Sequence, residues 1–256
     1  EMKNKKGIWF LIIFLSIVVV AITSGLIIYL TNPNITFSIY QKSEVLEEKS
    51  YTLDEINDIK IDVTSSNIKI NKQETSNIVI KITGYKKNQF SLNLKQEELE
   101  IKKDKGFLCF GFCTGKEEIE IFLPQDNSIS LTLQTTSGKI EIEDFSNSFV
   151  TAQTTSGDIY IKNASIMNIT STSGDIQIEN ISKGSLKSTS GDIKINSYQA
   201  EENGSITTTS GDVRIEKVQN AYLEATTKSG DIDIKNQDRF APYTIFITTM
   251  SGDIKG

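Results

Sequence analysis

Six aspartates recur at one position of a short repeated phrase, Thr-Ser-Gly-Asp-Ile, which is clearest at residues 155–159. In stacked copies their carboxylates would lie about 5 Å apart, where like charges repel by about 1 kcal/mol even in water. Two arrangements of the side chains would offset this repulsion. Either each carboxylate accepts turn N–H groups or hydroxyls, or Ca²⁺ bridges the column. We favour the first and assign no cofactor, because the Gly-Gly-x-Gly-x-Asp spacing of calcium-binding β-rolls is missing. The calcium candidates are Asp158, Asp175, Asp192, Asp212, Asp231 and Asp253.

The sequence offers little else for catalysis. It contains no histidine, so Ser/His and Cys/His nucleophiles are excluded. The serine of the phrase recurs in every copy, which indicates an architectural role. Neighbouring carboxylates such as Glu141 and Glu143 are a pair of the kind used in glycoside hydrolysis, but solvated acidic faces are far commoner. We predict that the protein is not an enzyme.

The segment 106–115 is unusual because it combines both cysteines of the chain with a cluster of large apolar residues. Its position between two charged strands predicts a protruding hairpin loop. Outside the cytoplasm, Cys109 and Cys113 would form one small disulfide, and the absence of histidine argues against a metal site. The apolar residues either fold onto the neighbouring domain or form a contact surface for a partner or lipid. They are Phe107, Leu108, Phe110 and Phe112.

The repeated phrase recurs seven times, with degenerate copies at both ends of the series. The steps between its glycines are 19, 17, 17, 20, 19 and 22 residues. A nearly fixed period of this length is typical of a solenoid. Each glycine is expected to supply a backbone conformation that a Cβ would penalise. The glycines are Gly138, Gly157, Gly174, Gly191, Gly211, Gly230 and Gly252.

Apolar residues alternate with polar ones on both sides of each glycine. In the first copy they are Leu131, Leu133, Ile140 and Ile142. This period of two predicts a half-buried strand before and after the corner. One such unit cannot bury its apolar face alone, whereas stacked units can. The sequence therefore predicts an all-β, single-stack β-solenoid with coils of about 20 residues.

The regular repeats occupy residues 127–256, and residues 51–126 are expected to form an N-terminal cap and irregular first coils. Alternation at 59–63 and 68–70 indicates a decayed first coil with asparagine in place of Gly-Asp. Further strands are expected at 78–82, 90–94, 99–101 and 119–123. Residues 31–50 are polar and charged, and we interpret them as a linker next to the membrane, with room for a short ordered part at 36–40.

An uncharged run of 23 residues, Ile8 to Leu30, is long enough to cross a bilayer as a helix. Trp9 and Tyr29 lie near its ends, where interfacial aromatics belong. Lysines precede it, which predicts a cytoplasmic tail at residues 1–7 and an extracellular C-terminal domain. A cleaved signal peptide is the alternative, but its apolar core would be shorter. We expect a single-pass protein of the cell membrane.

The net charge of −6 makes nucleic acid a poor partner. The Thr-Ser-Gly-Asp-Ile-x-Ile units, behind a strand that ends in Leu123-Pro124, resemble the bacterial putative-adhesin family of β-strand repeats, a domain of unknown function in cell-envelope proteins. The resemblance covers about residues 59–256. It implies a cell-surface β-solenoid with a binding or envelope role, and it carries over no catalytic residue.

Two functions follow as hypotheses. In the first, a flat polar face with Lys187, Lys194 and Arg214 binds an envelope glycan or protein without catalysis. In the second, the ectodomain regulates envelope stress through a membrane protein partner. The ligand and the oligomeric state are not determined by the sequence.

Overall fold

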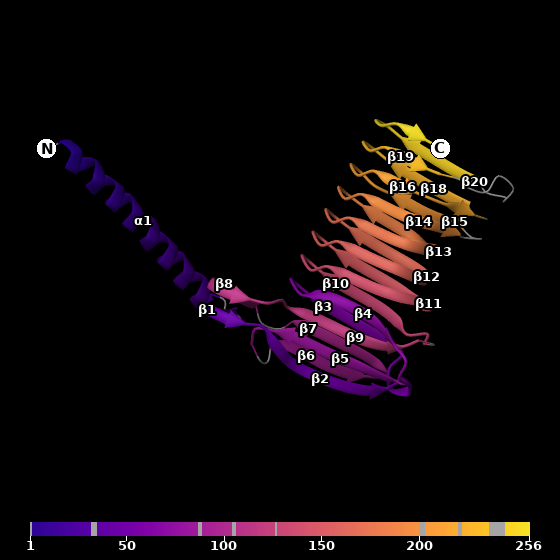
Figure 1. Cartoon of the computed structure of the whole chain (residues 1–256), viewed down its shortest axis with the longest axis horizontal. Helices are drawn as coiled ribbons and strands as arrows, with labels where there is room; N and C mark the ends of the chain where they lie inside the picture. The colour runs from indigo at the N-terminus through magenta and orange to yellow at the C-terminus, as the bar shows by residue number, and fades with distance from the viewer. Residues whose placement is uncertain are drawn as a thin grey trace.

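The computed structural model describes residues 2–31, 35–86, 89–103, 106–125, 127–199, 203–219, 222–235 and 244–256. Three parts follow one another in space (Figure 1): helix α1 (Met2–Thr31), a ribbon of β1 (Ile35–Lys42) and β8 (Gly106–Thr114), and a stack of coils. About 65% of the described residues lie in strands, and the stack is a β-solenoid of about six turns. The all-β solenoid predicted from the repeats is confirmed.

Helix α1 contains the uncharged run of the sequence. A search of the described residues for a helix long and apolar enough to cross a membrane found none. The predicted transmembrane span is therefore not shown.

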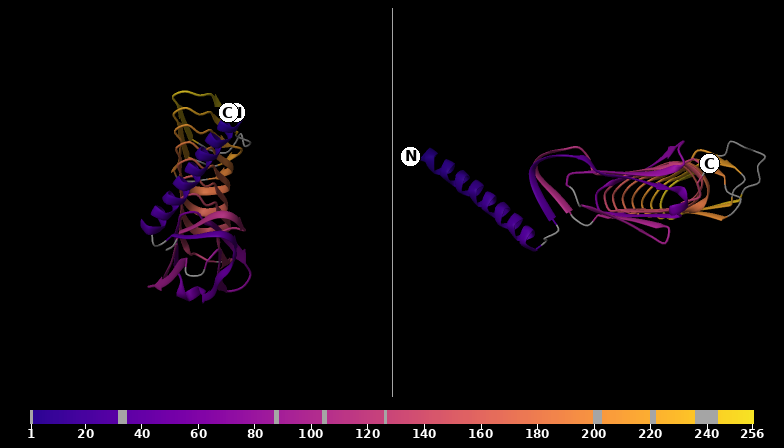
Figure 2. Two further views of the ribbon diagram at one scale, coloured as in Figure 1. Left: turned by 90° about the vertical axis from the view of Figure 1, so that its left-hand side faces the viewer. Right: turned by 90° about the horizontal axis from the view of Figure 1, so that it is seen from below.

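Each regular coil has two sides that face each other across the core (Figure 2, right). We call the strands before the glycine corner the first side and the strands after it the second side. Several strands run on from the second side of one coil into the first side of the next. The strands are β10 (Ser130–Thr135), β11 (Ile140–Thr154), β12 (Ile159–Ser171), β13 (Ile176–Ser188), β14 (Ile193–Gln199), β15 (Asn203–Thr207), β16 (Val213–Ile215), β17 (Val218–Gln219), β18 (Tyr222–Thr227), β19 (Ile232–Ile234), β20 (Thr244–Thr249) and β21 (Ile254–Lys255).

The parallel register between coils matches the columns read from the sequence. Leu131 pairs with Val150, and Val150 pairs with Met167, on the first side. Ile140 pairs with Ile159, and Ile159 with Ile176, on the second side. All of these residues are buried. β-Branched side chains fill a pleated, half-buried surface well, so one equivalent isoleucine from each coil stacks on the next.

The decayed coil predicted from the sequence exists, but it is not the first in the stack. Its strands β3 (Asp58–Val63) and β4 (Asn67–Gln73) lie between two later pieces of chain. On one side they pair with β7 (Glu98–Lys103) and β9 (Glu118–Pro124). On the other side they pair with β10 and β11. The chain therefore makes its second coil before its first.

The N-terminal end of the stack is closed by antiparallel strands at the base of Figure 1. On the first side, β6 (Phe90–Lys95) covers β7. On the second side, β5 (Asn77–Gly84) covers β9, and β2 (Glu44–Thr52) covers β5. A short 3₁₀ helix, η1 (Leu53–Glu55), follows β2. These strands cover the sheet edges at this end of the stack, which protects those edges from pairing with other chains.

Two expectations about the N-terminal half are corrected. The segment with the cysteines is not a hairpin loop, because β8 pairs in parallel with β1 as a separate two-stranded sheet. The stretch expected as a linker, 31–50, is ordered well beyond the short part allowed at 36–40, because it contains β1 and most of β2. Both errors have one cause: the partner of β8 lies about 70 residues earlier, where no local pattern signals it.

The reason for the corner glycines also differs from the expectation. Among the described residues, a positive φ is found only at Gln96, Glu97 and Gly115, so the corner glycines do not need the left-handed region. Glycine is required at each corner because the backbones of neighbouring coils approach too closely there for a Cβ. A Cβ on Gly157 would lie 1.8 Å from the carbonyl oxygen of Gly138, one coil below. Each corner glycine is therefore a contact between coils.

Tyr198 on β14 is the largest fully buried side chain of the core, and its hydroxyl has no hydrogen-bond partner within the described part of the chain. Gly204 leaves the space for it, since a Cβ there would meet the hydroxyl at 1.5 Å. Burial raises the pKa of Tyr198 to about 12. The phenol is thus a buried polar group without compensation, which costs about 1–3 kcal/mol.

We expect Tyr198→Phe to stabilise the protein by about 1 kcal/mol, because it removes the unpaired hydroxyl and keeps the ring. The difference in stability between the variant and the wild type should increase at alkaline pH. Because the folded pKa is above the unfolded one, the wild type loses stability as pH rises from about 10 to about 12, and the variant does not. Urea unfolding at a series of pH values measures both effects. A less stable Phe variant would mean that the hydroxyl makes a bond.

Candidate functional site

The aspartate column forms a hydrogen-bonded ladder along the corners. Asp158 Oδ1 accepts the backbone N–H of Asp175 one coil further on, at 3.0 Å. The same contact recurs from each aspartate to the next up to Asp253, at 2.8–2.9 Å. At the start of the ladder Asn67 Oδ1 accepts the N–H of Lys139 at 2.9 Å. The carboxylates thus hold N–H groups, as in the favoured interpretation, but the donor belongs to the neighbouring coil.

A second, buried ladder lies beside the first. The Gly157 N–H donates to Thr154 Oγ1 at 2.9 Å, and the Gly174 N–H donates to Ser171 Oγ at 2.9 Å. Small hydroxyl side chains at this position keep the buried corners satisfied. The described residues contain no group of three or more His, Cys, Asp or Glu side chains placed to hold a metal ion. In both ladders the side chains accept backbone N–H groups of the corners.

The backbone of the cysteine segment forms β8. The side chains of Cys109, Cys113, Phe107, Leu108 and Phe110 lie outside the described residues, so the predicted disulfide stays a prediction. Phe112 is described, and its side chain is 79% exposed.

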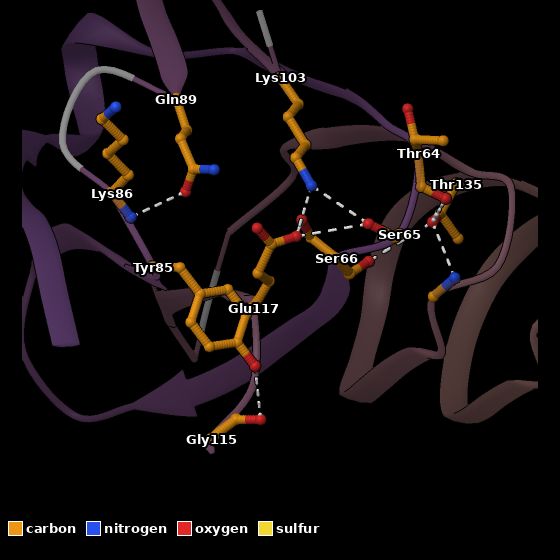
Figure 3. Close-up of polar contacts among 11 residues, drawn as sticks. Thr64, Ser65, Ser66, Tyr85, Lys86, Gln89, Lys103, Gly115, Glu117 and Thr135 are labelled. Carbon is orange, nitrogen blue, oxygen red and sulfur yellow. Dashed lines mark hydrogen bonds and ion pairs between the residues drawn. The ribbon is translucent and has the colours of Figure 1, made fainter. Parts of the chain in front are cut away.

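A polar cluster is buried under the cap, where Lys103 and Glu117 form an ion pair (Figure 3). Their side chains are only 5% and 8% exposed. Lys103 Nζ also donates to Ser65 Oγ at 3.1 Å. Nearby, the Tyr85 hydroxyl donates to the carbonyl of Gly115 at 2.9 Å, and burial followed by the charge of Glu117 raises the pKa of Tyr85. This cluster ties the loop after β5 to the start of β9.

A groove of about 300 Å³ lies on the outer face of the second side. Four successive second-side strands, β4, β11, β12 and β13, supply its walls, and Ile70 and Ile142 lie beneath them. We call it the charged groove. Its polar lining consists of Lys69, Glu141, Glu143, Tyr160, Lys162 and Glu179.

The acidic residues of the charged groove are each held by a neighbour. Glu141 forms an ion pair with Lys139 Nζ at 2.6 Å, and Glu143 Oε2 accepts a hydrogen bond from the backbone N–H of Lys72 at 2.7 Å. Glu179 accepts a short hydrogen bond from the Tyr160 hydroxyl, which, with burial, raises the pKa of Tyr160. The two carboxylates considered for glycoside hydrolysis thus lie in one groove, but each already has a partner.

The basic residues of the charged groove differ from the acidic ones because their side chains are not held by a neighbour among the described residues. Within the described part of the chain, the ammonium groups of Lys69 and Lys162 make no ion pair or hydrogen bond. The groove therefore offers free ammonium donors beside carboxylate acceptors and one tyrosine. Such a mixture suits recognition of a polar ligand.

The three basic residues grouped on one face by the sequence hypothesis do not lie together. Lys187 pairs in register with Thr207 on the first side. Lys194 pairs with Arg214 on the second side, and Arg214 already binds Glu216 and Asp233 at 3.3 and 3.2 Å. Sequence reasoning missed the charged groove, although Tyr160 is a signal: it is the one aromatic residue in an outward column of charged and amide residues.

A family model described as Toastrack DUF4097 matches residues 56–256. Among solved structures, a protein described as a putative adhesin from Bacteroides fragilis shares 20% identity over 85% of this chain and 99% of its own, with a TM-score of 0.58. A putative lipid binding protein from Parabacteroides distasonis shares 13% identity over 86% of this chain and 100% of its own, with a TM-score of 0.48. A putative cell adhesion protein from Clostridium sporogenes shares 15% identity over 83% of this chain and 98% of its own, with a TM-score of 0.35. A search of curated proteins found no match.

Proposed function

The chain belongs to the Toastrack DUF4097 family, and we propose that it is a non-catalytic, adhesion-type protein of the bacterial cell envelope that binds an envelope glycan in the charged groove. The observation that carries this proposal is the composition of the groove. Free lysines donate hydrogen bonds and glutamates accept them, around the partly buried Tyr160. A sugar hydroxyl does both, so a polyhydroxylated polymer matches the groove better than a ligand of one charge sign.

The solenoid supports this proposal by its regular geometry. Neighbouring strands are about 4.8 Å apart, so outward side chains of successive coils form straight rows next to the groove. Lys194 and Arg214 continue one of these rows beyond Tyr160. A long polymer that enters the groove has further contacts along the same face.

Anchoring to the cell membrane, with the C-terminal domain outside, is the second part of the proposal. It rests on the uncharged run Ile8 to Leu30 and on exposed apolar side chains along α1. Ile12, Ile13, Phe14 and Leu15 are each about half exposed or more. Four consecutive helical residues cover the whole circumference, and a helix that is apolar all round needs a non-aqueous environment.

We expect the full chain, solubilised in mild detergent, to co-sediment with an isolated glycan fraction of the envelope. The variants Tyr160→Ala and Lys162→Glu should each weaken binding by about tenfold, since a residue central to a binding site contributes at least about 1.4 kcal/mol. Lys187→Glu is the matched control, because it makes the same charge reversal on the opposite side of the coil. We expect it to bind like the wild type.

Two outcomes would contradict the proposal. Binding that is lost in Lys187→Glu but kept in both groove variants would place the site on the first side. No binding to any glycan fraction, together with binding to an envelope protein fraction, would exclude a glycan as the ligand.

A further inference from the structure

We propose that the ribbon of β1 and β8 lies on the lipid headgroup layer, with Tyr40 and Phe112 in the membrane interface. This inference rests on the membrane anchoring proposed above and adds a second, separate contact with the bilayer. The ribbon is the part of the fold between α1 and the solenoid in Figure 1.

The first argument is exposure. Tyr40 and Phe112 are partners in the register of the ribbon, and their side chains are 71% and 79% exposed. Two large aromatic residues side by side in water are unfavourable, whereas aromatic residues are enriched where a membrane meets water. Across both strands the only charged residue is Lys42.

The second argument is stability. β1 and β8 form a two-stranded sheet of their own, separate from the large sheet. A two-stranded sheet on its own is only marginally stable in water, and stability usually needs a third strand or packing against another element. Something must cover this one if it is to persist.

The third argument is reach, and it selects lipid over a protein partner. Only four Cα–Cα steps separate Thr31, at the end of α1, from Ile35, at the start of β1. Each step spans 3.8 Å, so the ribbon begins within about 15 Å of the helix end. If α1 crosses the membrane, its covalent link holds the ribbon at the bilayer surface, where lipid is always present.

The two strands of the ribbon are joined to each other where the chain leaves it, and the Tyr85 hydroxyl, on the loop after β5, donates to the Gly115 carbonyl at this junction at 2.9 Å. Where the strands enter the body, the Ser43 N–H donates to Thr114 O at 3.0 Å, and the Lys116 N–H donates to Ser43 Oγ at 3.1 Å. Gly115 adopts φ +108°, and a Cβ there would lie 1.9 Å from Ser43 Oγ. A docked ribbon would therefore fix how the charged groove is presented above the membrane.

Tryptophan quenching in vesicles tests this placement. The full chain is reconstituted into phosphatidylcholine vesicles with brominated acyl chains. The wild type has a single tryptophan, Trp9, whose emission reports insertion of α1. The variant W9F/F112W places the only tryptophan on the ribbon. The control W9F/F246W places it on β20, at the far end of the stack, where Phe246 is 53% exposed.

We expect brominated lipid to reduce the emission of Trp9 and of the tryptophan at 112, and to leave the emission of the tryptophan at 246 unchanged. Quenching of Trp9 without quenching at 112 would overturn the ribbon proposal while membrane anchoring stands. No quenching of Trp9 would refute the anchoring and, with it, the ribbon contact. Equal quenching at 112 and 246 would show that the whole domain lies on lipid and that the ribbon is not a specific contact.

Discussion

Gly174→Ala is expected to lower the free energy of unfolding by at least about 3 kcal/mol, the upper end of the usual cost of overpacking. An added Cβ would lie 1.8 Å from the carbonyl oxygen and 2.4 Å from the carbonyl carbon of Gly157. Both atoms are backbone, so no side chain can turn away to make room. The two coils would have to separate, which breaks the N–H to carboxylate contact between Asp175 and Asp158.

Urea unfolding followed by circular dichroism measures this effect. Gly256→Ala is the matched control, because a Cβ there meets its nearest neighbour at 3.4 Å, an ordinary contact. We expect the control to unfold like the wild type. A loss of less than about 1 kcal/mol for Gly174→Ala would mean that the coils adjust to a methyl group, and that close approach is not why glycine occupies the corner.

Glu117→Leu is expected to destabilise the protein by about 3–5 kcal/mol, because it leaves the buried Lys103 ammonium without its counter-charge. Lys103 is only 5% exposed and would keep one partner, Ser65 Oγ. The double variant K103M/E117L should recover most of the loss, since apolar residues of similar size frequently replace a buried ion pair without cost. One carboxylate oxygen of Glu117 already has no partner among the described residues, which favours this recovery.

The same unfolding measurement on the two single variants and the double variant forms a complete cycle. Lys139→Gln is the control for losing an ion pair in water: Lys139 and Glu141 are 49% and 36% exposed, so its removal should cost less than about 1 kcal/mol. If the double variant is as unstable as the sum of the single variants, the pair has no mutual interaction, and the cap is held by the neighbouring hydrogen bonds instead.

The repeated coils were predictable because their information is local. Alternation of apolar and polar residues identifies the buried face of each strand, and a glycine marks each corner. Once Leu131 is aligned with Val150 on the glycine, the pairing of the two strands follows, and the structure has the same pairing. The aspartate contacts were predicted in kind but not in detail, because their donor belongs to the next coil and appears only after stacking.

The charged groove was not predictable in the same way. Lys69 and Glu143 are 74 residues apart in sequence, and they meet because the coil of β3 and β4 stacks beneath β11. Nothing near Lys69 indicates this neighbour. The outward positions of a strand can be read from the pattern, but which outward side chains form a hollow depends on the sizes of their neighbours in other coils.

By itself, the sequence determined the solenoid, its coil length and its buried columns, because these depend on contacts between equivalent positions of a repeat. Only the tertiary structure decided the order of the first coils, the pairing of β1 with β8 and the reason for the corner glycines. These depend on which distant backbones meet. That outcome is set by the packing of the whole stack, and a single stretch of chain does not encode it.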